Sequence, residues 1–162
     1  MVMDVRGKNP ASERGRYFSG NSNNSWWHPL PDYCITVAPD ICAPCKAWHY
    51  HEGDGLDAAG AVALADALEN EISARRTLDF ERRHTSAREM APNEPCDICA
   101  GTGVRTPVPH LGAGDLKEGG IKCNGCEGAG YVRPWASHYP FSSENVAAFV
   151  AFLRESGGFA IY

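Results

Sequence analysis

The sequence predicts an α+β protein that consists of a small helical domain, a zinc-knuckle β-hairpin module and an amphipathic C-terminal helix. Apolar residues recur at helical spacing over two segments, 57–72 and 143–155, and a phrase of paired cysteines and glycines occurs twice between them. With 162 residues, 43% of them hydrophobic, the chain can bury a modest core. We expect a mainly helical region at 1–92, a zinc module at 93–135, and a C-terminal helix and strand at 136–162 that pack on the core.

The first 25 residues are rich in Gly, Asn, Ser and charged residues, which predicts extended or irregular structure. The stretch "WWHPLPDY" follows and indicates an aromatic corner before a proline turn. Adjacent tryptophans cannot face one core together, so we expect one of Trp26 and Trp27 in the core and the other at its rim. Pro39 and Asp40 then predict the start of a helix that carries "ICAPCKAWHY".

Two later helices have clearer signals. Asp57 is a good N-cap, and the helix after it has one apolar face formed by Ala61, Leu64, Ala65, Leu68 and Ile72. Helix is expected to continue or resume through "TLDFERRHTSARE". Near the end, Ser142 caps "SENVAAFVAFLRES", and Gly157 can end that helix in the left-handed conformation. The apolar face of this last helix contains Val146, Phe149, Val150 and Leu153, and "FAIY" after it predicts a short strand.

The repeated phrase has the form C-x-x-C-x-G-x-G, with cysteines at Cys96, Cys99, Cys123 and Cys126. Two thiolates separated by two residues can bind one ion when the backbone between them turns tightly. The glycines permit positive φ and let backbone N–H groups approach the sulfurs. Two such knuckles complete a tetrahedral site, so we predict one structural Zn²⁺ bound by the four cysteines. The prolines and glycines between the two copies predict a projecting hairpin or loop.

This phrase resembles the cysteine-rich zinc domain of the DnaJ chaperone family over roughly residues 96–133. That family carries four copies and two zinc ions, whereas this chain carries two copies, and "HPL" at His28 departs from the His-Pro-Asp of a J domain. The resemblance implies binding of unfolded or extended peptide but not co-chaperone activity. Segments such as "GKNPASERGRYF" and "CNGCEGAGYVRPW" also resemble small uncharacterised proteins of bacteria and their phages, a likeness that implies no activity.

A third cysteine pair lies outside the repeat. On a helix that begins near Asp40, Cys42, Cys45 and His49 would share one side. Cys34 or His51 would supply a fourth ligand, so a second metal site is one interpretation. Thiol–disulfide exchange at Cys42 and Cys45 is another, because a CxxC pair at a helix start can have a lowered thiol pKa. Structural or incidental cysteines are the third.

The charge of the chain disfavours nucleic acid as a partner. The formal net charge is −5, and the local basic exception is an arginine-rich stretch formed by Arg75, Arg76, Arg82, Arg83 and Arg88. A solvated helix face is the main interpretation of this stretch, and a phosphate-binding strip is the alternative. Within it, Arg75, Arg76, Arg82 and Arg83 are the candidate phosphate contacts if the chain binds a nucleotide or nucleic acid. The N-terminus has no apolar segment typical of a signal peptide, and the apolar run "VAAFVAFL" is too short to cross a bilayer. We therefore expect a cytoplasmic protein with no membrane contact.

Together these features favour a zinc-stapled protein-interaction module, in which a closed metal site orders a surface for a protein partner. The sequence contains neither H-E-x-x-H nor G-x-S-x-G, and four cysteine ligands leave no open metal position for catalysis. A nucleotide or nucleic-acid binder and a thiol–disulfide oxidoreductase are the alternatives. The likeness to phage proteins adds the hypothesis that the chain regulates or antagonises a host system.

Overall fold

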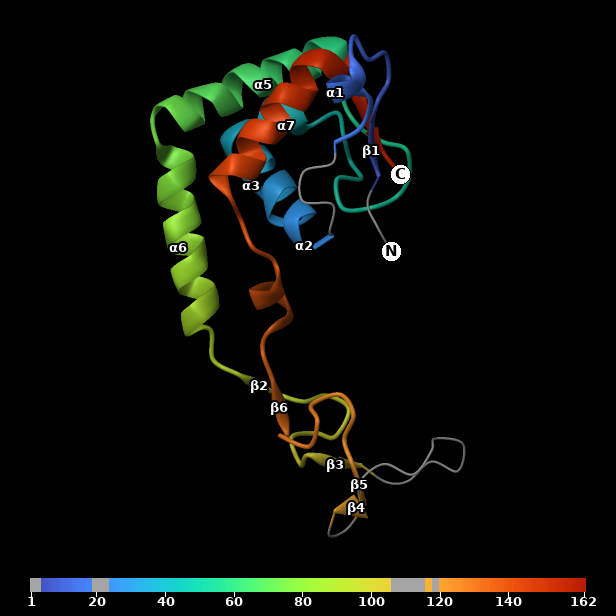
Figure 1. The fold of residues 1–162 in the computed structure, drawn as a ribbon, viewed down its shortest axis with the longest axis vertical. Helices are drawn as coiled ribbons and strands as arrows, with labels where there is room; N and C mark the ends of the chain where they lie inside the picture. The colour runs from blue at the N-terminus through green and yellow to red at the C-terminus, as the bar shows by residue number, and fades with distance from the viewer. Residues whose placement is uncertain (1–3, 19–23, 106–115, 118–119) are drawn as a thin grey trace. The chain divides into compact units, whose positions relative to one another are not determined.

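The computed structural model describes residues 4–18, 24–105, 116–117 and 120–162 (Figure 1). The chain forms two compact units: residues 1–87 with 139–162, called the core unit below, and residues 88–138, called the cysteine unit. Helices and small antiparallel sheets occur together, in agreement with the predicted α+β class. Within the described residues, no helix has both the length and the apolar character needed to cross a membrane.

The core unit combines helices with a two-stranded antiparallel sheet formed by β1 and β7. Its elements in chain order are β1 (Val5–Gly7), α1 (Glu13–Arg16), α2 (Asn24–Trp27), α3 (Pro29–Val37), α4 (Pro39–Cys42), α5 (Ala58–Ser73), α7 (Ser143–Ser156) and β7 (Phe159–Ile161). Helix α6 (Arg76–Met90) begins in this unit, and its last residues belong to the cysteine unit.

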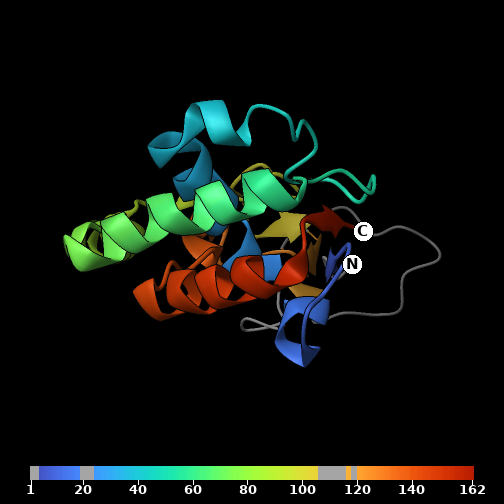
Figure 2. The same cartoon turned by 90° about the horizontal axis from the view of Figure 1, so that it is seen from above.

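Helices α5 and α7 lie side by side at the centre of the core unit (Figures 1 and 2). The Asp57 side chain accepts a hydrogen bond from the Gly60 N–H at 2.7 Å, and the Ser142 hydroxyl accepts one from the Asn145 N–H at 3.3 Å. Gly157 ends α7 with φ 60° and ψ 35°. Both predicted N-caps and the predicted left-handed C-terminus are therefore confirmed.

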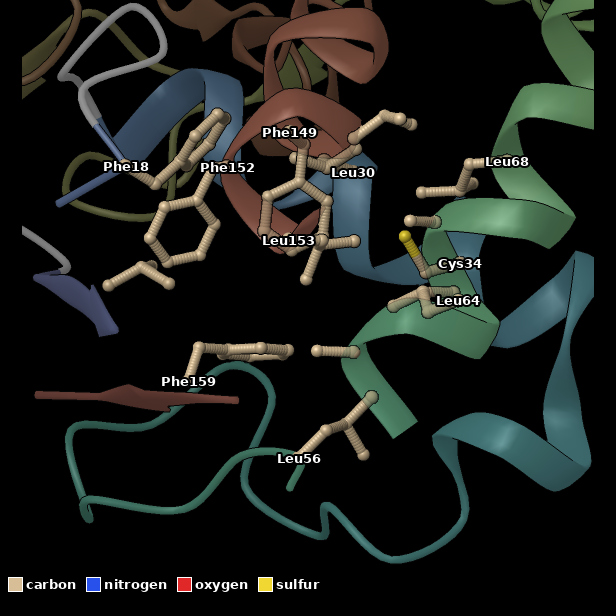
Figure 3. Close-up of a cluster of buried hydrophobic side chains, with 14 of the residues drawn as sticks. Phe18, Leu30, Cys34, Leu56, Leu64, Leu68, Phe149, Phe152, Leu153 and Phe159 are labelled. Atoms are coloured by element: carbon tan, nitrogen blue, oxygen red, sulfur yellow. The ribbon is translucent and has the colours of Figure 1, made fainter. Parts of the chain in front are cut away.

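The two predicted apolar faces belong to one buried cluster (Figure 3). Four of their side chains are at most 1% exposed: Leu64 and Leu68 of α5, and Phe149 and Leu153 of α7. The ring of Phe18, from the segment before α2, packs edge-on against Phe149 with the ring centroids 4.9 Å apart. Aromatic and aliphatic side chains from distant parts of the sequence thus form a single core, which holds α5 and α7 together.

The two ends of the described chain meet in the β1–β7 sheet. Val5 pairs with Ile161 and Gly7 with Phe159, which confirms the strand predicted from "FAIY". Strand β1 fits the expectation of extended or irregular structure in residues 1–25, whereas helix α1 and the start of α2 correct it. Strand β1 depends on pairing with β7, which lies at the opposite end of the chain. Local sequence patterns cannot show such a pairing.

The proline-rich stretch after the tryptophans is helical, which corrects the expectation of a proline turn. Helix α3 begins at Pro29, and Pro31 also lies in its first turn. Prolines are tolerated there because the first N–H groups of a helix have no partner within it. Trp27 is buried in the core and Trp26 is half-buried, as predicted for two adjacent tryptophans.

The prediction that one helix carries all of "ICAPCKAWHY" is also wrong, because α4 ends at Cys42. Pro44 explains the early end: its ring clashes with the carbonyl of the residue four positions earlier, and it has no N–H to donate. Residues 43–57 continue as turns and loop. Cys45 and His49 therefore do not share a helix face with Cys42.

Helix α6 confirms the helix expected through "TLDFERRHTSARE". A break at Arg75, whose φ is 60°, separates it from α5. The first half of α6 packs in the core unit through aromatic contacts. The rings of Phe80 and Phe141 lie 4.6 Å apart, and Nε2 of His84 is 2.7 Å from the carbonyl oxygen of Tyr139. The part of the "TLDFERRHTSARE" helix nearest α5 is thus fixed by packing.

The cysteine unit contains very short strands and one 3₁₀ helix. They are β2 (Glu94–Pro95), β3 (Val104–Arg105), β4 (Leu116–Lys117), β5 (Gly120–Lys122), β6 (Tyr131–Val132) and η1 (Trp135–His138). Strand β2 pairs with β6, and β5 lies between β3 and β4, all antiparallel. The projecting loop predicted between the two cysteine phrases falls largely on residues 106–115 and 118–119, outside the described residues.

Candidate metal centre

The four cysteines of the repeated phrases lie together in the cysteine unit. The sulfurs of Cys96 and Cys123 are 3.9 Å apart, and those of Cys99 and Cys126 are 3.7 Å apart. All four sulfur atoms fall within 4.8 Å of one another, and all four side chains are buried. The two phrases thus converge on one centre, which could bind a metal ion such as zinc.

The sulfur spacing fits tetrahedral coordination. Four thiolates at the usual Zn–S distance of about 2.3 Å form a tetrahedron whose edges measure about 3.8 Å. The Cys96–Cys123 and Cys99–Cys126 sulfur–sulfur distances, 3.9 and 3.7 Å, lie on either side of this value. They are also much longer than a disulfide bond of about 2.05 Å. The donor set therefore suits one thiophilic ion better than two disulfides.

Four short strands bring the two phrases together crosswise. Strand β2 precedes the first phrase and pairs with β6, which follows the second; β3 follows the first phrase and pairs with β5, which precedes the second. Each phrase is thus held at both ends by a strand attached to the other phrase. Val132 of β6 packs against the cysteine cluster and is its apolar neighbour.

Backbone hydrogen bonds repeat in the two phrases with near two-fold symmetry. The Cys96 N–H donates to the Gly130 carbonyl, and the Cys123 N–H donates to the Gly103 carbonyl, both at 2.9 Å. In each phrase the second glycine also donates its N–H to the second cysteine sulfur, at 3.2 Å from Gly103 to Cys99 and from Gly130 to Cys126. Such N–H···S bonds stabilise thiolates and orient them for a metal.

The glycines of the motif meet two separate requirements. All four have positive φ, between 73° and 88°, a conformation that other residues rarely adopt. At the second glycine of each phrase the backbones also approach closely: a Cβ on Gly103 would lie 2.4 Å from the Gly128 carbonyl oxygen, and one on Gly130 would lie 2.4 Å from that of Gly101. A Cβ on Gly101 would meet nothing closer than 3.6 Å. The first glycine of each phrase is therefore needed for its positive φ. The second is needed for its positive φ and because a Cβ there would clash with the other phrase.

The surroundings of the sulfurs shift two of the thiol pKa values in opposite directions. Burial raises the pKa of Cys96 to about 11. Burial also acts to raise the pKa of Cys99, but the N–H of Gly103 and the neighbouring thiols outweigh it and lower that pKa to about 7. The Gly103 N–H and the neighbouring thiols thus favour the thiolate form of Cys99, which is the form that binds a metal.

The third cysteine pair lies in the core unit and does not gather the ligands considered for a second site. In the described part of the chain, the one group of three or more potential ligands within 4.8 Å is the centre formed by Cys96, Cys99, Cys123 and Cys126. Cys34, Cys42 and Cys45 are buried in the hydrophobic core, and His51 is exposed.

His49 has other partners. Its Nδ1 lies 3.1 Å from Nδ1 of His28, and its Nε2 lies 2.8 Å from Oδ1 of Asp32. Both ring nitrogens are thus engaged, which leaves neither for a metal shared with Cys42 or Cys45. Burial, and secondarily the neighbouring His49, lowers the pKa of His28. No local pattern could have revealed this pair, because residues 28 and 49 come together only in the folded chain.

The environment of Cys42 and Cys45 does not favour thiol–disulfide exchange. Burial raises the pKa of Cys42 to about 11. Burial, followed by the nearby Asp54 carboxylate, raises the pKa of Cys45 to about 12. Exchange catalysts instead have lowered thiol pKa values, because the thiolate is the nucleophile.

The predicted phosphate-contact arginines lie between the residue before α6 and the middle of that helix. Arg76 is bound to Glu71 through both Nε and Nη2, with the closest contact at 2.7 Å, and Arg82 lies 3.6 Å from Asp79. Arg83 donates to the Asp79 carbonyl. Arg75 occupies the break before α6. Acidic neighbours thus partly neutralise this stretch, which reduces its attraction for phosphate.

Comparisons of the chain with known protein families, with curated proteins and with solved structures find no match. The centre is therefore defined by its own geometry: four buried cysteines, supplied by two symmetric knuckles, at spacings suited to one tetrahedral ion.

Proposed function

We propose that the cysteine unit binds one Zn²⁺ through Cys96, Cys99, Cys123 and Cys126, and that the chain is a zinc-stapled protein-interaction module. The observation that carries the proposal is the converging set of four buried sulfurs. Zinc is preferred over other ions because tetrahedral thiolate sites suit it and because it needs no redox partner. A site with four protein ligands is closed to water, so the ion has a structural role.

The side chains exposed around this centre favour a protein partner. In the described part of the cysteine unit, four large hydrophobic side chains are exposed by more than half: Met90 (79%), Trp135 (67%), Ile98 (57%) and Tyr131 (56%). Ile98 lies inside the first knuckle, and Tyr131 directly follows the second. Exposed apolar groups carry no benefit for folding, whereas Trp and Tyr often dominate the binding energy of protein interfaces. In this proposal the metal holds these side chains in place for the partner.

The proposal is tested by affinity capture with the full chain, followed by mass spectrometry. Four forms are compared: the natural sequence, Cys96→Ser, Trp135→Ala and Val62→Ala. Val62 is a matched control, because it is 43% exposed and lies on α5 of the core unit. A protein retained by the natural sequence and by Val62→Ala, but lost with Cys96→Ser and with Trp135→Ala, supports the proposal.

Equal capture by all four forms would refute the proposed role of the cysteine unit. Direct titration of the recovered partner, with purified components, then measures the loss for Trp135→Ala. A central interface tryptophan is expected to contribute about 2 kcal/mol or more, equivalent to a thirtyfold weaker Kd. The identity of the partner also tests the hypothesis that the chain regulates or antagonises a host system.

A further inference from the structure

A polar hollow of about 470 Å³ lies within the cysteine unit, apart from the cysteine centre. It is open to solvent, and its lining residues are Arg88, Glu89, Arg133, Ser137 and His138. They come from the end of α6, from the segment after β6 and from η1. None of them is one of the four cysteine ligands, and Arg88 is the last arginine of the arginine-rich stretch considered in the sequence.

Contacts with backbone and hydroxyl oxygens hold the two guanidinium groups in this hollow. Arg88 donates from Nε to the Ser137 carbonyl at 2.8 Å. Arg133 donates from Nη2 to the Arg88 carbonyl, and its Nε lies 3.4 Å from the Ser137 hydroxyl. That hydroxyl in turn donates to the Pro134 carbonyl at 2.7 Å. Both arginines are thereby oriented by neutral acceptors, which leave their positive charges uncompensated.

The surrounding charges do not neutralise these two arginines. Among the described residues, no carboxylate lies within ion-pair distance of Arg88 or Arg133, although Glu89 lines the same hollow. Several arginines elsewhere in the described chain do have acidic partners, as Arg154 does with two carboxylates at 2.6 Å. Two unpaired guanidinium groups in one hollow repel each other, and a bound anion would relieve that repulsion.

We propose that this hollow binds the dianionic phosphate group of a phosphate monoester. Two guanidinium groups match the charge of a dianion, and their planar N–H groups suit tetrahedral oxyanions. The hollow is also larger than an inorganic phosphate, so it has room for part of the organic group that carries the phosphate. A phosphorylated side chain and a small organic phosphate share this chemistry. The proposal does not depend on the protein-interaction function.

The test is an NMR titration of the zinc-loaded full chain with inorganic phosphate, a short phosphoserine peptide and AMP, each in separate experiments. Saturable shifts of the amide signals of Ser137 and His138 and of the Nε–H signals of Arg88 and Arg133 are expected. The peptide and AMP distinguish a protein ligand from a small organic phosphate, and the tighter of the two identifies the source. If none of the three gives saturable shifts at these residues, the proposal is wrong.

Variants then assign the binding to the hollow. Arg88→Gln is expected to weaken binding at least tenfold, whereas Arg105→Gln should change it less than twofold. Arg105 is a matched control because it lies in the same unit, in β3, and does not line the hollow. The cobalt-substituted absorption spectrum of the cysteine centre verifies that each variant is folded. If Arg88→Gln alters that spectrum, Arg88→Lys replaces it, with a smaller but still measurable loss expected because the planar donor group is removed.

Two further outcomes would overturn the proposal. Equal weakening by Arg88→Gln and Arg105→Gln would show a nonspecific effect of net charge. Binding of a single-stranded oligonucleotide without terminal phosphates as tightly as the best monoester would show that the site recognises monoanionic diesters, and hence nucleic acid, instead of a dianion.

Discussion

Removing the metal should unfold the cysteine unit while the core unit keeps its helices. The perturbation is a strong chelator, or the variant Cys126→Ser, applied to the reduced protein. The matched variant is Cys42→Ser, since Cys42 is also a buried cysteine but lies in α4 of the core unit. We expect Cys126→Ser to reproduce the effect of the chelator and Cys42→Ser to keep the metal.

The magnitudes follow from what each unit buries. Structural zinc supplies about 10–16 kcal/mol to small domains at neutral pH. Besides its cysteines, Ile121 is the buried aliphatic residue in the described part of the cysteine unit, and its burial contributes about 1.5–3 kcal/mol. The core unit instead buries many large side chains, Phe149, Phe152 and Phe159 among them, each with a contribution of this size. The free energy lost with the metal therefore exceeds what burial contributes in the cysteine unit, so that unit should unfold. The core unit keeps its buried side chains and should remain folded.

Two spectra distinguish the units. Helices α5 and α7 and most of α6 belong to the core unit, so circular dichroism at 222 nm reports mainly on that unit. Amide NMR signals of residues 96–105 and 120–130 report on the cysteine unit. Chelation should collapse the NMR dispersion of these residues with little change at 222 nm. Loss of most of the helical signal on chelation, or dispersed signals that persist for these residues, would contradict this prediction.

Two other substitutions test the local accounts. Gly103→Ala should weaken metal binding far more than Gly101→Ala. Both positions have positive φ, but only at Gly103 would a Cβ come as close as 2.4 Å to a backbone oxygen. Equal losses in a competition titration with a metal indicator would contradict this prediction. Asp54→Asn should destabilise the core unit by about 1–3 kcal/mol at pH 7, because the Asp54 carboxylate accepts N–H groups of the loop, from Ala47 at 3.0 Å and Gly55 at 2.8 Å among others. Burial acts to raise the pKa of Asp54, but these bonds outweigh it and lower the pKa, so the stabilisation is complete above the unfolded-state pKa of about 3.9 and is lost as the pH falls below it. In urea unfolding, the difference between Asp54→Asn and the natural sequence should therefore shrink from pH 7 to pH 3, and a difference that stays constant would contradict the charge-based explanation.

Features that depend on neighbouring residues could be predicted from the sequence. The caps at Asp57 and Ser142, and the apolar spacing after each, predicted α5 and α7 because a helix repeats every 3.6 residues and its ends need specific partners. The convergence of the four cysteines followed from the motif, because each knuckle supplies two ligands and a tetrahedral ion needs four.

Features that depend on distant residues could not be predicted in this way. Strand β1 needs β7 as its partner, and the contact between His28 and His49 joins segments that share no local pattern. Local rules also failed where they were applied too broadly. Prolines usually end helices, yet Pro29 and Pro31 lie in the first turn of α3, where a missing N–H does no harm. The opposite effect of Pro44, which follows α4, separated Cys45 from the helix face expected for it.

The central claim is that one zinc ion is bound by four cysteine sulfurs, and X-ray absorption at the zinc K edge measures this most directly. The sample is the full chain, purified under reducing conditions and carrying the metal that it acquired during expression. We predict about one zinc per chain and a first shell of four sulfurs at about 2.3 Å. A first shell that contains nitrogen or oxygen, or a protein that folds its cysteine unit with no metal bound, would contradict it.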